Sequence, residues 1–110
     1  MAARRQALRK EIRQMVKRIV ARFDPDRVIL FGSRARGQAS PDSDVDLLVV
    51  MPVTGGRRDK AVEIGVALDD IRVAKDIVVT TPEEFAWRRR IVGTIERPAA
   101  REGEVLYVRG

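Results

Sequence analysis

The stretch of sequence that decides the fold reads VILFGSRARG at residues 28–37 and SDVDLLVV at residues 43–50. The wholly apolar run from Val28 to Phe31 predicts a short strand that is buried on both faces. Asp44 to Met51 predict a second strand, whose apolar latter part favours a central place in the sheet. Between them, Ser33 to Gly37 predict one or two helical turns that Ser33 starts and Gly37 ends. Polar and charged residues are therefore expected at the ends of two buried strands.

Patterns on either side of this stretch predict the remaining helices and strands. Apolar residues recur at three- and four-residue steps in residues 3–23 and again in residues 59–72, which indicates two amphipathic helices. A third strand is expected at residues 76–80, a short helix starting at Thr81-Pro82, a helical piece at residues 95–101 perturbed by Pro98, and a last strand at residues 104–109. This order predicts an α/β (α+β) fold, in which residues 1–110 form one domain with a small mixed β-sheet and helices packed on it.

Composition excludes several kinds of site. The 110 residues contain no cysteine and no histidine, so disulfides, cysteine-based zinc sites and histidine-dependent nucleophilic catalysis are excluded. Any metal must be bound by oxygen, which points to magnesium or, as an alternative, manganese. The absence of cysteine fits a reducing cytoplasm. No apolar run approaches the roughly 20 residues that span a bilayer, so no membrane partner is expected.

The basic charge of the chain has two interpretations. The net charge is +6, which favours nucleotides, nucleic acid or an acidic protein as partners but equally fits a solvated basic surface. Many arginines and lysines lie in residues 3–23, yet no aromatic residues are interleaved with them for base stacking. We therefore expect this helix to dock on the core rather than to bind nucleic acid directly.

The glycine–serine pair after the first strand has the character of a phosphate-binding turn. Gly32 lets the backbone turn sharply and lets a ligand approach closely, and Ser33 is expected at a helix N-terminus, where an anion is favoured. Arg34 or Arg36 could reach the same anion. The frame from Gly32 to Gly37 resembles a Walker A loop, but Gln38-Ala39 stand where that loop needs lysine and a hydroxyl residue. The sequence thus predicts a phosphate site that is not a P-loop.

Three aspartates are candidate metal ligands. Asp44 and Asp46 are two residues apart on a predicted strand, so their carboxylates share a face at a spacing of roughly 6–7 Å. Their mutual repulsion is unfavourable unless a cation lies near both, although such acids can simply be solvated at a strand entry. Asp76 heads the third strand and would join them if that strand lies beside the second. Three such carboxylates could hold two metal ions.

These residues resemble a known family. Residues 32–37, residues 43–49, Asp76 in its strand and the closing residues 101–107 are similar to the signature of nucleotidyltransferases with the DNA polymerase β fold. Within that superfamily the chain resembles the minimal nucleotidyltransferases of the MNT group, which are antitoxins paired with a HEPN-domain toxin.

The resemblance implies a function and residue roles. Gly32, Ser33, Arg36 and Ser43 would bind the nucleotide, and Asp44, Asp46 and Asp76 would act as catalytic residues and ligate Mg²⁺. Asp76 would complete the metal site or act as base. The resemblance further implies transfer of AMP from ATP to a tyrosine of the HEPN toxin. The alternatives are an antitoxin that neutralises its partner by binding alone and a nucleotidyltransferase acting on a small molecule.

Overall fold

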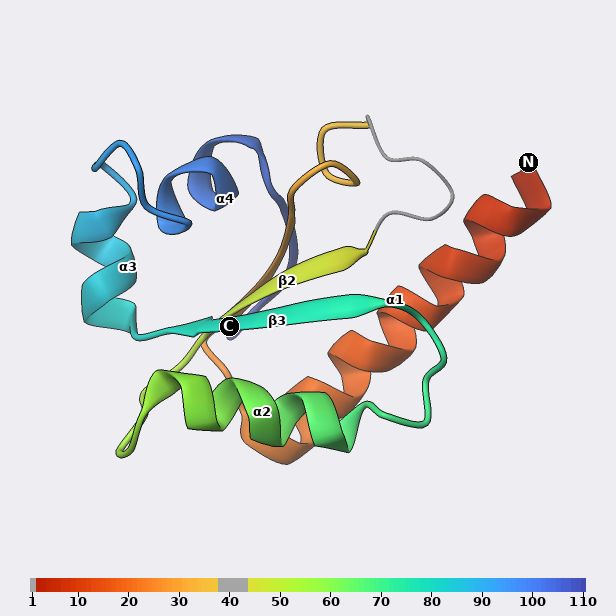
Figure 1. Ribbon diagram of the computed structural model, residues 1–110, viewed down its shortest axis with the longest axis horizontal. Helices are drawn as coiled ribbons and strands as arrows, with labels where there is room; N and C mark the ends of the chain where they lie inside the picture. Colours follow the sequence, from red (N-terminus) through yellow and green to blue (C-terminus); the bar gives the residue numbers. More distant parts are fainter. Residues whose placement is uncertain (1, 38–43) are drawn as a thin grey trace.

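A four-stranded mixed β-sheet forms the centre of the computed structural model, which describes residues 2–37 and 44–110 (Figure 1). The strands are β1 (Arg27–Phe31), β2 (Val45–Val50), β3 (Lys75–Thr80) and β4 (Glu104–Val108), in the order β3-β2-β1-β4. β2 runs parallel to β3, whereas β1 is antiparallel to both β2 and β4. The expected mixed sheet is confirmed, and β2 has the central place that its apolar residues predict.

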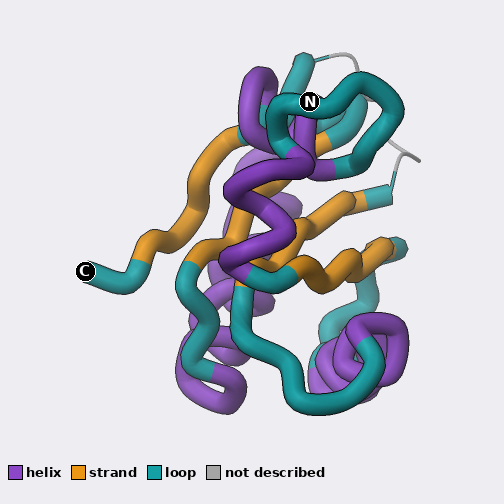
Figure 2. The backbone as a smooth tube through the Cα atoms, turned by 90° about the vertical axis from the view of Figure 1, so that its left-hand side faces the viewer, coloured by secondary structure: helices purple, strands orange, loops and turns teal. Residues whose placement is uncertain are grey.

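Helices cover both faces of this sheet. In the described residues these are α1 (Ala2–Phe23), α2 (Arg57–Ala67), α3 (Pro82–Arg88) and α4 (Glu96–Glu102). Figures 1 and 2 show α1 and α2 on one face and α3 and α4 on the other. No helix in this part of the chain is both long and apolar enough to cross a bilayer.

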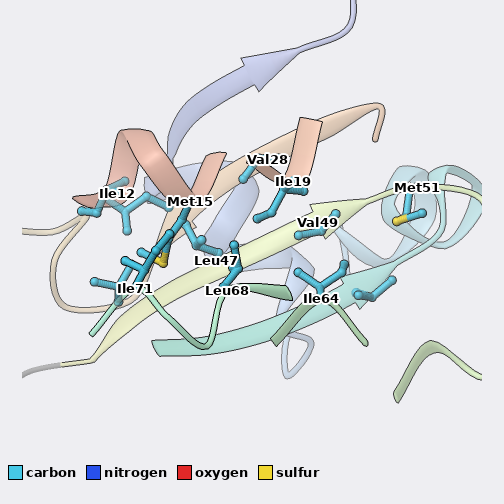
Figure 3. Close-up of a cluster of buried hydrophobic side chains, with 13 residues drawn as sticks. Ile12, Met15, Ile19, Val28, Leu47, Val49, Met51, Ile64, Leu68 and Ile71 are labelled. Carbon is cyan, nitrogen blue, oxygen red and sulfur yellow. The ribbon is translucent and has the colours of Figure 1, made fainter. Parts of the chain in front are cut away.

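The larger core cluster lies between the sheet and the pair α1 and α2. Figure 3 shows Met15 and Ile19 of α1 converging with Ile64 of α2 on the strand residues Leu47 and Val49. All five side chains are fully buried. Burying a side chain of this size contributes about 1.5–3 kcal/mol, so this cluster supplies much of the stability of the fold.

A smaller cluster forms on the opposite face, because successive strand residues point to opposite sides. Leu48 and Val50 of β2 meet Phe85 of α3 and Ala99 of α4 there. The two short helices cover only part of this face. Asp46 points to the same side as Leu48, but α3 and α4 leave it partly exposed.

Two local features explain where the short helices begin. Thr81 caps α3 by accepting a hydrogen bond from the backbone amide of Glu84 at 3.2 Å, as the sequence predicts. Pro98 is the third residue of α4, where the amide it lacks would have no partner within the helix. The expected perturbation at Pro98 is therefore wrong.

The turn after β1 is short, and its length and its end at Gly37 agree with the expectation. Residues 33–37 form consecutive hydrogen-bonded turns and not an α-helix, with Gly32 at φ +77° and Gly37 at φ +74°. The Arg36 amide donates to the Gly32 carbonyl at 3.3 Å, and the Gly37 amide donates to the Arg34 carbonyl at 3.3 Å. Two left-handed glycines bracket the segment, which keeps it too short to propagate a helix.

Candidate active site

Asp46 and Asp76 lie side by side on neighbouring strands. They are paired in the register of the parallel strands β2 and β3, so their Cα atoms are separated by roughly one strand spacing, about 4.8 Å. Paired residues point to the same face, which here is the face that α3 and α4 cover farther along the strands. Asp46 is half-buried and Asp76 is exposed. The sheet order therefore brings together two acids that are 30 positions apart in the sequence.

The electrostatic environment of Asp46 is unfavourable for its charge. Burial raises the pKa of the Asp46 carboxyl above its ordinary value, and the neighbouring carboxylates of Asp76 and Asp44 raise it further. Arg34 and Arg36 act in the opposite direction but do not outweigh these effects. A cation bound near Asp46 would relieve the repulsion among the three acids.

Gly32 lies directly against the Asp46 carboxylate. A Cβ atom at position 32 would overlap the Asp46 carboxylate oxygen Oδ2 and lie 3.2 Å from Cγ. Phe31, the residue before the glycine, is also the register partner of Asp46 in β1. The glycine is therefore required both for its left-handed backbone and for its missing side chain. The predicted phosphate turn and the predicted metal ligand are in contact.

Two arginines of this turn, Arg34 and Arg36, are close enough to the acids to lower the pKa of Asp46. Arg36 lies 3.8 Å from the carboxylate of Glu102, at the end of α4. The positive charge of Arg34 lowers the pKa of Asp46 more than that of Arg36 does. The sequence offers both arginines as anion ligands but gives no signal that ranks Arg34 first. That ranking depends on the fold of the turn.

The structure describes two of the three remaining predicted residues, Asp44 and Ser33. Asp44 is exposed and immediately precedes β2, close enough to Asp46 to affect its pKa. Ser33 is half-buried at the start of the turns. Ser43 lies outside the described residues. Within residues 2–37 and 44–110, no three acidic side chains come close enough together to enclose a metal ion by themselves.

The donor set nevertheless suits magnesium. Magnesium in nucleotide sites is usually held by one or two carboxylates together with substrate phosphates, not by an all-protein cage. The Asp46 carboxylate, next to Asp44 and Asp76 and in contact with Gly32, provides oxygen donors beside a place for phosphate.

Comparisons with known proteins identify the family and the fold of the chain. The family model described as "Nucleotidyltransferase domain" matches residues 9–100. No curated protein matches the chain in sequence. Among solved structures, a predicted nucleotidyltransferase of Sulfolobus solfataricus is similar at 22% identity and a TM-score of 0.63, covering 91% of this chain and 79% of that one. A toxin–antitoxin structure with AMP-PNP is similar at 20% identity and a TM-score of 0.51, covering 91% and 73%. At these identities, the structural likeness shows the fold alone.

Proposed function

The chain belongs to the nucleotidyltransferase domain family, and from this premise we propose that it transfers AMP from ATP to a tyrosine hydroxyl of a HEPN-domain toxin and so acts as its antitoxin. The observation that carries the proposal is the contact between Gly32 and the Asp46 carboxylate, with Asp76 paired to Asp46. A phosphate turn and an acid pair then share one site. The toxin–antitoxin structure with AMP-PNP has a similar fold, which supports this choice of partner and nucleotide.

Each residue has a proposed task in the transfer. The acceptor oxygen forms a bond to the α-phosphorus, the bond from that phosphorus to the bridging oxygen of the β-phosphate breaks, and pyrophosphate leaves toward Gly32 and Ser33. Asp76 takes the proton of the acceptor hydroxyl. Arg34 and Arg36 orient the phosphates. Most of the rate enhancement comes from positioning and charge complementarity.

Magnesium, or manganese in its place, would be held by Asp46 with Asp44 and Asp76 only together with oxygens of the ATP phosphates, because the three carboxylates do not enclose an ion by themselves. When bound, the ion supplies positive charge that neutralises the phosphates. The residues then keep the phosphates and the acceptor hydroxyl in line on one face of the sheet.

The experiment incubates the chain with labelled ATP, magnesium and the protein encoded by the neighbouring reading frame. We expect the label on that protein, and we expect Asp46→Asn to reduce labelling by at least about a hundredfold. Asp69→Asn is the matched control, because Asp69 is an exposed aspartate next to the end of α2. Labelling at the wild-type rate by Asp46→Asn would contradict the proposal.

Toxin inhibition in the same samples separates the alternatives. If Asp46→Asn still neutralises the toxin without labelling it, neutralisation by binding replaces AMP transfer. If the label goes to a small hydroxyl compound and never to the protein, the acceptor is a small molecule.

A further inference from the structure

The outer edge of β3 lies in an open groove that reaches Asp76. The groove has a volume of about 950 Å³, and its walls come from α2 and from the segment 93–96 that leads into α4. Figure 1 shows β3 at the front of the sheet, with α2 on one side of it and α3 and α4 on the other. Asp76 is itself a lining residue. The groove therefore connects the outer edge of β3 to the proposed base.

We propose that this groove binds an extended segment of the protein acceptor as an additional strand beside β3, and that its wall selects an acidic segment. This inference rests on the proposed function, in which the acceptor is a protein. It deepens that function by naming how the acceptor is held.

The outer edge of β3 has backbone groups that can form hydrogen bonds with another strand. The amides of Val45 and Met51 donate to the carbonyls of Ala74 and Thr80, at 2.9 and 3.0 Å. Backbone groups alternate in direction along a strand. The even-numbered residues of β3 therefore direct their amide and carbonyl groups toward β2, and the odd-numbered residues direct theirs away from it. These residues are Lys75, Ile77 and Val79. No backbone hydrogen bond within the described residues uses their outward groups. Such a row of open donors and acceptors is a template for strand addition.

The walls leave room for an added strand and offer apolar contacts to it. Small residues line them at Ala61 and Gly65 of α2 and at Gly93. A Cβ atom at Gly65 would meet nothing within 4 Å. Val62 of α2 is 61% exposed and Ile95 on the other wall is 45% exposed. Side chains of an added strand alternate between these two sides.

The charge of the groove favours an acidic segment. Four basic side chains line it, from Arg57, Arg58, Lys75 and Arg88, against two acidic ones. Arg57 and Arg88 also contact Glu84, which is not among the lining residues. Opposite charges on a docking segment would speed association and fix its direction.

Register explains how a hydroxyl would reach the site. A residue paired with Asp76 in the added strand projects from the same face as Asp76 and Asp46. A tyrosine at that position would extend toward the acids, whereas its neighbours in sequence would contact the groove walls.

Gly65 allows a sharp test. Gly65→Trp places a large side chain in the groove, while the matched control Gly65→Ala adds only a methyl group to open space. Both changes suit a helix better than glycine, so both variants should fold. The probe is a short synthetic peptide with a central tyrosine between alternating valine and glutamate residues. A second peptide has lysine in place of glutamate.

Three measurements on the full chain test whether the groove binds an acidic strand. The glutamate peptide should slow amide exchange at Ile77 and Val79, and the lysine peptide should not. N-methylation of one alternate set of peptide amides should abolish this protection, whereas N-methylation of the other set should leave it. Gly65→Trp should raise the KM for AMP transfer to the glutamate peptide by about tenfold or more with kcat little changed, since binding and not chemistry is lost.

The results that overturn the inference differ from those that overturn the proposed function. Equal transfer to the protein acceptor by Gly65→Trp and Gly65→Ala refutes the groove assignment and leaves nucleotidyl transfer standing. Protection of Ile77 without AMP transfer to any acceptor supports the groove assignment and refutes transfer. Slowed amide exchange at Ile77 and Val79 that increases with protein concentration, with no peptide present, means that two copies of the chain pair through β3. This result refutes the inference.

Discussion

The contact between Gly32 and Asp46 decides the geometry of the site at the scale of single residues. The left-handed backbone at Gly32 lets the chain turn away from β1, and the missing side chain leaves space for a carboxylate on the next strand. The turn and the acid therefore cannot be altered independently.

Gly32→Ala should both destabilise the protein and inactivate it. The left-handed conformation costs a non-glycine residue about 1–2 kcal/mol, and the new methyl group would displace the Asp46 carboxylate. Gly37→Ala is the matched control, because Gly37 has a similar φ of +74° but open space around its Cβ position. Urea unfolding should show a loss in both variants, and AMP transfer should fail only in Gly32→Ala. Equal activity in the two variants would refute this role of Gly32.

Asp46→Asn should leave the metal-free fold at least as stable as the wild type at neutral pH. The raised pKa of Asp46 means that its charge is disfavoured in the folded state. The folded chain therefore binds a proton there more tightly than the unfolded chain, so the wild type loses stability as the pH rises from the ordinary aspartate range through the raised pKa. Denaturation of both forms in chelator, across this range, measures the effect. A wild type that gains stability over Asp46→Asn with rising pH would contradict it.

At the scale of elements, the sequence predicts the strands well and the helix ends less well. The apolar runs of β1 and β2 leave little choice but buried strands. The expected helix at residues 59–72 ends earlier, at Ala67, because Leu68 to Ile71 form turns in which Leu68 and Ile71 are still buried. Apolar periodicity therefore continues after the helix has stopped, and the pattern cannot locate the end.

The site itself is predictable only in part. The acids at the heads of β2 and β3 are visible in the sequence, but their pairing requires the strand order. The groove along β3 cannot be predicted from the sequence, because residues from α2, β3 and the segment 93–96 form it together.

A polar contact joins α1 to the end of α2. Arg18 donates to the Ala67 carbonyl at 3.0 Å and also to the Asp70 carboxylate, and this second bond lowers the pKa of Asp70. A lowered pKa stabilises the fold above the ordinary aspartate pKa, and the stabilisation is lost as the pH falls through the lowered value.

Asp70→Asn should therefore reduce the free energy of unfolding at neutral pH, and the difference from the wild type should shrink as the pH falls below about 4. The effect should also weaken in high salt, since Asp70 is exposed. Thermal unfolding across pH measures it, with Asp69→Asn as control. A difference that is independent of pH would exclude the ion pair as its source.

At the scale of the whole molecule, the longer helices α1 and α2 lie over the larger core on one face of the sheet, and the short helices α3 and α4 cover only part of the other face. The partial layer is fastened by a buried pair, in which the Thr80 hydroxyl of β3 donates to the Glu96 carboxylate of α4 at 2.7 Å. Glu96 is only 4% exposed. This pair holds α4 over one part of the face and leaves the acids on the same face open.

Thr80→Val should destabilise the protein by about 1–3 kcal/mol, because it leaves a buried carboxylate without its donor. Combining it with Glu96→Leu should recover part of the loss, since both polar partners are then replaced by apolar groups. Urea unfolding of the two single variants and the double variant completes the cycle. Strictly additive losses would show that the two side chains do not interact.

The pairing of β1 with β4 has a consequence for synthesis of the chain on the ribosome. β4 is the last strand in the described chain, and the Arg109 amide beyond it donates to the Asp26 carbonyl just before β1, at 2.9 Å. During translation, β1 can pair with β2 as soon as that hairpin emerges, but its other edge stays open until residues 104–108 leave the exit tunnel. The open edge of β1 is therefore a site for aggregation of the nascent chain until β4 has emerged and paired with it.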